Sequence, residues 1–242
     1  MSLSFISKPV TNVLTSISAE KKPDEKVSQI KNWETVSVRI NTYRAIDPKI
    51  VENALKELSI QYSSSNPELS ASFKEASCLN APSSKRQEMI NHLDELETSE
   101  LNNQLEESIS KERTDATTML LYSGANPNLL IDMGNSKPTI LTATILYNLR
   151  GWKELIAYGA DVNYQYREEE ETPLTSAIKN KKPSIVVELL KNKANPNKPS
   201  KGLTPLHLCL ERAKTDSLCN LYFYTQMIKP IIEHGSNLDA QN

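Results

Sequence analysis

A short segment that recurs four times in the second half of the chain restricts the fold most strongly. Each copy holds a glycine or lysine, a small residue, an asparagine or aspartate, a variable residue and a final asparagine or aspartate. An apolar pair stands four residues before each copy. The copies occupy 124–128, 159–163, 193–197 and 235–239, so their first residues lie 35, 34 and 42 positions apart. Such a period is the signature of a repeat array, and we expect four repeats.

A second signature begins with Thr-Pro-Leu and occupies 172–177 and 204–209, with a weaker copy at 138–143. Each copy of it precedes the apolar pair of its repeat. A threonine hydroxyl can accept a bond at a helix N-terminus, and the proline that follows needs no N–H there. The glycine of the first signature is expected to end a second helix in the left-handed conformation. Lys193 replaces this glycine, at a cost of about 1 kcal/mol. The two signatures together predict a pair of helices in each repeat.

These two signatures resemble the ankyrin-repeat family, whose unit is a turn and two helices over about 33 residues. The resemblance implies an all-α ankyrin-repeat solenoid of about four repeats over residues 103–242, with a helical N-terminal extension. The first repeat is expected to be cap-like, with helices at 104–109 and 116–121. In the last repeat, ten extra residues are expected between the two helices, around 213–221. Pro230 should fall inside the second helix or mark its late start.

The first hundred residues lack both signatures. Residues 1–46 are predicted to be partly irregular, with a strand within 33–46 because apolar residues alternate there. Residues 47–102 are predicted to form three helices that pack on the end of the repeats and cover it. Asp47 and Asn66 each precede a proline and should cap the first two helices. Ser84 with Gln87 has the spacing of a capping box for the third.

The composition argues against several classes of partner. A net charge of −2 without a basic stripe gives no reason to expect nucleic acid. No run approaches the roughly 18 apolar residues of a membrane helix, so no membrane insertion is expected. Three widely spaced cysteines suit a reducing compartment, and we expect a cytoplasmic protein. Because the chain stops where the resemblance would begin another turn, we also expect the natural protein to continue past Asn242.

Residues that could carry catalysis or hold a metal ion are few and scattered. His207 occupies the fourth position of Thr-Pro-Leu-His, where the resemblance implies a structural hydrogen bond. Cys78 and His92 would need contact in space and a third orienting group, which their separation in the sequence does not indicate. The glutamates at 168–171 are neighbours in one turn and are expected to point in different directions, which favours a solvated loop over a metal site. The sequence therefore predicts no enzyme, no cofactor, no metal and no small-molecule substrate.

The resemblance implies a partner protein, bound through the concave face that turn tips and first helices form. Tyr164 and Tyr166 are expected as anchors, and Ile145 and Leu146 as a partly exposed apolar patch. The predicted protein-binding residues are Asn135, Lys137, Ile145, Leu146, Tyr164, Tyr166, Glu169, Glu171, Lys179, Asn180, Lys201, Leu203, Glu211 and Arg212.

Two other functions stay open at the level of sequence. The first is an enzyme whose catalysis resides in residues 1–102 or beyond residue 242, with the repeats as a targeting module. The second is an inhibitory or regulatory subunit. The Lys-, Asn-, Ser- and Ile-rich composition and the divergent repeats resemble ankyrin effectors that intracellular bacteria deliver into the host cytoplasm. Eukaryotic adaptor proteins are the alternative source.

Overall fold

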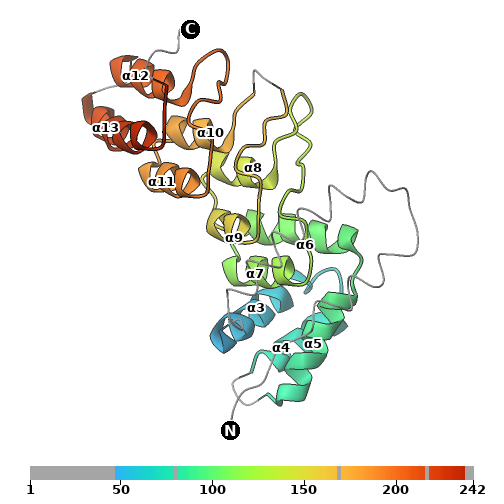
Figure 1. The fold of residues 1–242 in the computed structure, drawn as a ribbon. Helices are drawn as coiled ribbons and strands as arrows, with labels where there is room; N and C mark the ends of the chain where they lie inside the picture. The colour runs from blue at the N-terminus through green and yellow to red at the C-terminus, as the bar shows by residue number, and fades with distance from the viewer. Residues whose placement is uncertain (1–46, 79–80, 168–169, 216–217, 238–242) are drawn as a thin grey trace. The chain divides into compact units, whose positions relative to one another are not determined.

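The computed structural model describes residues 47–78, 81–167, 170–215 and 218–237. Every regular element in these ranges is an α-helix, and the only strand-like pairings are two isolated bridges, Leu130–Thr139 and Ser200–Leu203 (Figure 1). The prediction of an all-α fold is therefore confirmed for the described residues. The irregular segment predicted at 1–46, with its strand, lies outside the described residues. No helix in the described ranges has the length and apolar content needed to cross a bilayer.

The chain divides into two compact units, of which the first contains the described residues up to Ser108 together with Arg113–Ala125 and Ala157–Gly159. Its helices are α3 (Pro48–Gln61), α4 (Pro67–Ala76), α5 (Ser83–Glu95), most of α6 (Thr98–Ser110) and α7 (Thr114–Tyr122). The helices predicted for the first repeat lie inside α6 and α7, although α6 begins well before the predicted start and runs across position 102.

Side chains cap two of these helices as predicted. The Asp47 carboxylate accepts the Lys49 N–H at 2.9 Å, and the Asn66 side-chain oxygen accepts the Leu69 N–H at 3.0 Å. The capping box predicted at Ser84 and Gln87 is wrong. The helix already begins at Ser83 after Pro82, and no side chain caps it. Ser84 therefore lies within the first turn, and the Gln87 amide bonds Asn91 instead.

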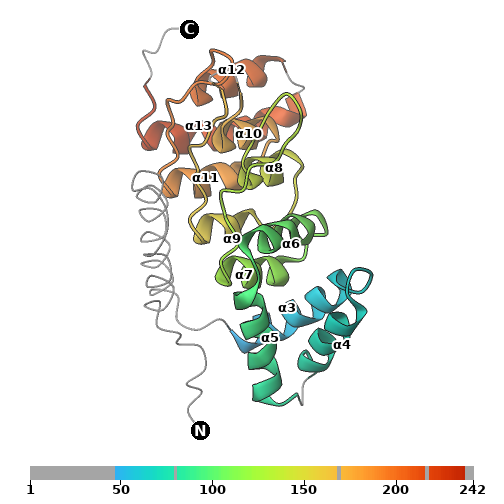
Figure 2. The same cartoon turned by 90° about the vertical axis from the view of Figure 1, so that its right-hand side faces the viewer.

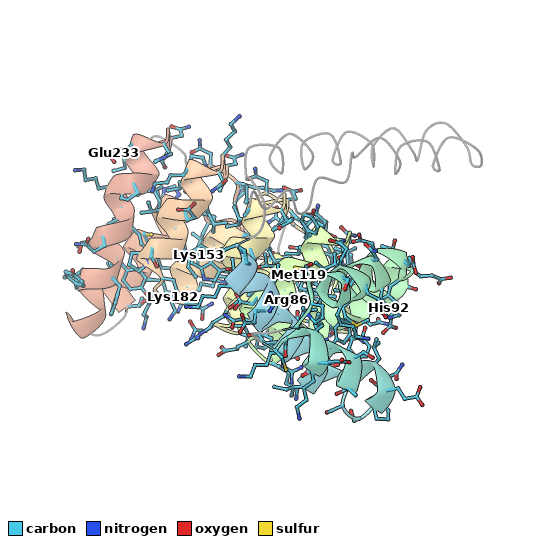
Figure 3. The ribbon with its side chains drawn as sticks, turned by 90° about the horizontal axis from the view of Figure 1, so that it is seen from below. Arg86, His92, Met119, Lys153, Lys182 and Glu233 are labelled. Atoms are coloured by element: carbon cyan, nitrogen blue, oxygen red, sulfur yellow. The ribbon has the colours of Figure 1, made fainter. Side chains whose placement is uncertain are left out.

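Within the first unit, α3 packs against both α4 and α7, and α4 also lies against α5 (Figure 2). Leu55 and Leu58 of α3 and Met119 of α7, which Figure 3 labels, are fully buried. The Glu57 carboxylate of α3 accepts the Ala116 N–H in the first turn of α7 at 2.8 Å. The predicted extension therefore shares a core with the second helix of the predicted first repeat.

The second unit contains Ile109–Glu112, Asn126–Ile156 and Ala160–Asn242. Its first helices α8 (Ile140–Leu146), α10 (Pro173–Lys179) and α12 (Pro205–Thr215) form one layer. The second helices α9 (Trp152–Ala157), α11 (Pro183–Lys191) and α13 (Leu218–Glu233) form the other (Figure 1). Contacts of α10 with α8 and α12, and of α11 with α10 and α13, hold the layers together.

Left-handed residues mark the ends of helices, as the sequence predicts. Gly124, Gly159 and Gly235 have φ of 109°, 89° and 89°, and Lys193 takes the same place at 67°. A glycine accepts this conformation without cost, whereas a side chain there crowds its own carbonyl. Lys193 is therefore a strained substitute for glycine.

The ten extra residues of the last repeat were expected to form an insertion between its two helices. In the structure most of them belong to the helices, which are longer than those of the second and third repeats. α12 continues to Thr215 and α13 begins at Leu218, so helix takes up most of the predicted insertion. Pro230 lies inside α13, which excludes the alternative of a late start. Tyr224, Met227 and Ile231 of α13 are fully buried. These three side chains follow a spacing of three and four residues, so the longer helix buries one face.

The final asparagine of the first signature joins successive turns of the second unit. Its side-chain oxygen accepts a backbone N–H from the next turn. The three bonds run from Asp161 to Asn128 at 2.6 Å, from Asn195 to Asn163 at 2.7 Å and from Asn237 to Asn197 at 2.6 Å. The amide groups of the last two asparagines also donate to the carbonyls of Lys193 and Gly235. We call this set the asparagine ladder.

Candidate protein-binding surface

Threonine hydroxyls set the register of the first helices in the second unit. Thr139 accepts the Thr142 N–H at 3.3 Å and begins α8, and Thr172 accepts the Thr175 N–H at 3.1 Å and begins α10. The predicted register, with Pro138 in the place of Thr172, is therefore one residue too early. In the structural register, Ile145 is therefore the counterpart of the buried Ile178.

This shift changes which side chains of α8 reach the surface. Ile145 is 1% exposed, so the prediction that it is partly exposed is wrong, whereas Leu146 is 37% exposed as predicted. The next residue, Tyr147, is 61% exposed, and its hydroxyl points to the Met133 sulfur at 3.8 Å. Tyr147 is not among the predicted binding residues. Alignment on the Thr139 cap would have found it.

Side chains from three successive repeats line one hollow of about 130 Å³ in the second unit. Pro138 and Leu146 come from the second repeat, Tyr166 and Glu171 from the third, and Lys201 from the fourth. The lining is completed by Ser136, Thr142, Glu170 and Ser176, so four of the nine lining residues were predicted as binding residues. The turns and first helices thus bring together residues that are up to 65 positions apart in the chain.

Glu171 is held firmly at the edge of this hollow. One carboxylate oxygen accepts the Ser176 hydroxyl at 2.8 Å, and the other accepts the Lys179 ammonium at 2.5 Å. The Glu171 and Lys179 side chains are only 23% and 22% exposed, so water screens this pair less than a surface pair. Asn180 donates to the carbonyls of Ile145 and Ser176. These three predicted binding residues therefore serve first to fix α10 in its surroundings.

The remaining predicted residues differ in their exposure to solvent and in their partners. Tyr164 and Tyr166 are half-buried, and the Arg167 guanidinium lies 5.0 Å from the centre of the Tyr166 ring. Lys137 pairs with Asp132 at 3.4 Å. Asn135, Lys201 and Glu211 are exposed, and Leu203 and Arg212 are half-buried. Glu169 lies outside the described residues.

The histidine and cysteine side chains considered for catalysis take part in local hydrogen bonds, ring contacts or packing. His207 shares a hydrogen bond of 2.9 Å with the Thr204 hydroxyl, which confirms the structural role predicted for it. The Cys78 thiol donates to the Lys74 carbonyl, and the His92 ring lies edge-on to the Phe73 ring. Burial raises the pKa of the Cys209 thiol to about 12, which keeps it protonated at neutral pH. In the described ranges, no group of three or more His, Cys, Asp or Glu side chains is arranged to hold a metal ion.

The family model described as ankyrin repeats, in three copies, matches residues 140–242. This segment begins at the first residue of α8 and contains all six helices of the second unit. No curated protein matches the chain.

Proposed function

Residues 140–242 are ankyrin repeats, and on this premise we propose that the chain binds a partner protein through the turns and first helices of repeats two to four. Ankyrin repeats are in general modules of protein–protein interaction. The observation that supports this surface is the pair Leu146 and Tyr147, which lies exposed beside the hollow. We call these two residues the α8 patch.

The α8 patch has the composition of an interface centre. Protein interfaces have an apolar or aromatic centre and a polar rim, and tyrosine is frequent among the residues that carry the binding energy. At the corresponding positions of the third repeat stand Lys179 and Asn180, which bond within the unit. The second repeat therefore supplies the apolar centre, and the third and fourth repeats supply the charged rim.

The finer form of this proposal concerns the partner. The composition and the divergent repeats favour a bacterial effector that binds a host protein in the host cytoplasm. An inhibitory or regulatory subunit would use the same surface. In the described residues no observation favours the enzyme alternative over binding, and we therefore propose a non-catalytic role.

Photo-cross-linking tests the location of the surface. A photoreactive amino acid at position 147 should capture the partner, whereas the same group at position 222 on α13 should not. Tyr222 is a matched control because it is an exposed tyrosine of the same unit, 66% accessible. With the partner identified, Tyr147→Ala should weaken binding at least tenfold, since anchor residues contribute about 2 kcal/mol or more and 1.4 kcal/mol is tenfold. Tyr222→Ala should leave it unchanged, and the reverse pattern would exclude the α8 patch.

A further inference from the structure

We propose that a basic edge next to the α8 patch receives an acidic segment of the partner protein. The basic edge consists of Arg150, Lys153, Lys181 and Lys182, which stand in or directly after the connections between the two helices of the second and third repeats. This inference rests on the proposed function and adds the chemistry of the partner to it. Carboxylates of the partner would form charge-assisted hydrogen bonds with these cations.

The fold brings the two connections together. Asn148 and Lys181 occupy the same place in them, each with a φ of 56°. The Asn180 side chain donates to the Ile145 carbonyl at 3.4 Å, which joins the end of α10 to the end of α8. Neighbouring helices pack about 8–10 Å apart, and about three residues of an extended chain span this distance. One extended segment of a partner can therefore reach the cations of both connections.

The four basic side chains are accessible to a partner. The Arg150 side chain is 76% exposed, Lys153 is exposed, and Lys181 and Lys182 are half-buried. A lysine can keep its ammonium group in water while its hydrocarbon stem lies along the protein surface. Figure 3, which labels Lys153 and Lys182, shows both on the same side of the second unit.

The charges of the two connections favour an anion. Residues 147–154 and 180–184 hold the four cations and one carboxylate, Glu154, for a net charge of +3. Glu112 of the preceding repeat lies next to them and lowers this sum to +2. Lys179 and Glu171 are bound to each other and cancel. An acidic segment would therefore be attracted to this edge, and a basic one would be repelled.

A carboxylate suits the basic edge better than a phosphate backbone. The Glu112 carboxylate already lies 3.8 Å from the Arg150 guanidinium, so the chain itself places a carboxylate against this edge. A nucleic-acid site typically makes about six to ten phosphate contacts, and four cations are too few for that. Tyr147, 61% exposed, stands three residues before Arg150 and offers the same segment an aromatic contact. An acidic protein segment can use both the tyrosine and the cations.

Selection from a random heptapeptide library displayed on phage, with the full chain as target, tests the inference. We expect aspartate or glutamate to be enriched in the selected peptides. By fluorescence anisotropy, those peptides should bind the double variant Lys181→Gln/Lys182→Gln about fivefold more weakly, because two solvent-screened charge pairs are lost. Lys191→Gln/Lys229→Gln is the matched control. It removes the same charge from two exposed lysines of the same unit, 63% and 80% accessible, and should bind like the wild type.

The outcomes separate this inference from the proposed function. Peptides that lose binding to Tyr147→Ala but lack enriched acidic residues, or that bind Lys181→Gln/Lys182→Gln as tightly as the control, overturn the inference and leave the α8 patch standing. Acidic peptides that need the two lysines but bind Tyr147→Ala unchanged support the basic edge and count against the α8 patch. A selection that yields no binding peptide overturns the inference. Tighter binding of phosphatidylserine vesicles or of oligothymidylate through the same lysines also overturns it. Circular dichroism of each variant verifies that the helices are intact.

Discussion

Removal of one step of the asparagine ladder should destabilise the second unit measurably. Asn163 is a suitable position, because its side chain makes two bonds to the next turn: it accepts the Asn195 N–H at 2.7 Å and donates to the Lys193 carbonyl at 3.0 Å. Asn163→Ala removes both bonds. A hydrogen bond contributes about 0.5–1.5 kcal/mol, and these groups are exposed to water. We therefore expect a loss of about 1–2 kcal/mol in the free energy of unfolding.

Urea denaturation followed by circular dichroism measures this loss. With a slope of about 2 kcal/mol per molar urea, the midpoint should fall by about 0.5–1 M. Asn135→Ala is the control, because Asn135 is an exposed turn asparagine outside the ladder, and surface changes of this kind stay within about 0.5 kcal/mol. If Asn163→Ala and Asn135→Ala unfold at the same urea concentration, the ladder does not stabilise the repeats.

Three further predictions concern single residues. Lys193→Gly should raise the melting temperature, because the left-handed φ of 67° costs a side-chain-bearing residue about 1 kcal/mol and costs glycine nothing. An unchanged or lower melting temperature would contradict this. In a Cys219→Ser background, Cys78 should react with a thiol reagent at pH 8 within minutes while Cys209, with its pKa raised to about 12, stays unmodified until the chain unfolds. Burial raises the pKa of Glu57 above its ordinary value of 4.5, so the folded state binds this proton more tightly than the unfolded state. Stability of the wild type should therefore fall relative to Glu57→Gln as pH rises from about 4.5 through the raised pKa, and parallel pH profiles of the two proteins would refute this.

The repeats and the two N-terminal caps were predictable because each depends on residues close together in the sequence. A threonine or asparagine next to a proline fixes a helix start locally, and the glycine after an apolar pair fixes a helix end. The third helix shows the limit of this reasoning. Ser84 and Gln87 have the spacing of a capping box, but Pro82 starts the helix earlier.

The candidate surface was predictable only in part, because its details depend on register and on contacts across turns. Because the register was predicted one residue too early at Pro138, Ile145 was wrongly expected to be exposed and Tyr147 was not expected at the surface. Leu146 was predicted correctly. The bonds from Glu171 to Ser176 and Lys179 depend on how the third turn folds back on α10. No pattern of neighbouring residues predicts such a contact. Its effect is to turn a predicted binding carboxylate into one that the unit already uses.

The asparagine ladder also determines how the second unit responds to mechanical tension. Its bonds link one turn to the next, so a force applied along the row of turns loads them in series and each junction carries the whole force. The junctions differ in strength. Asn163 and Asn197 each span theirs with two hydrogen bonds, whereas Asn128 contributes a single bond to Asp161. Rupture under load should therefore begin between the turns of Asn128 and Asp161, and the third and fourth repeats should separate later.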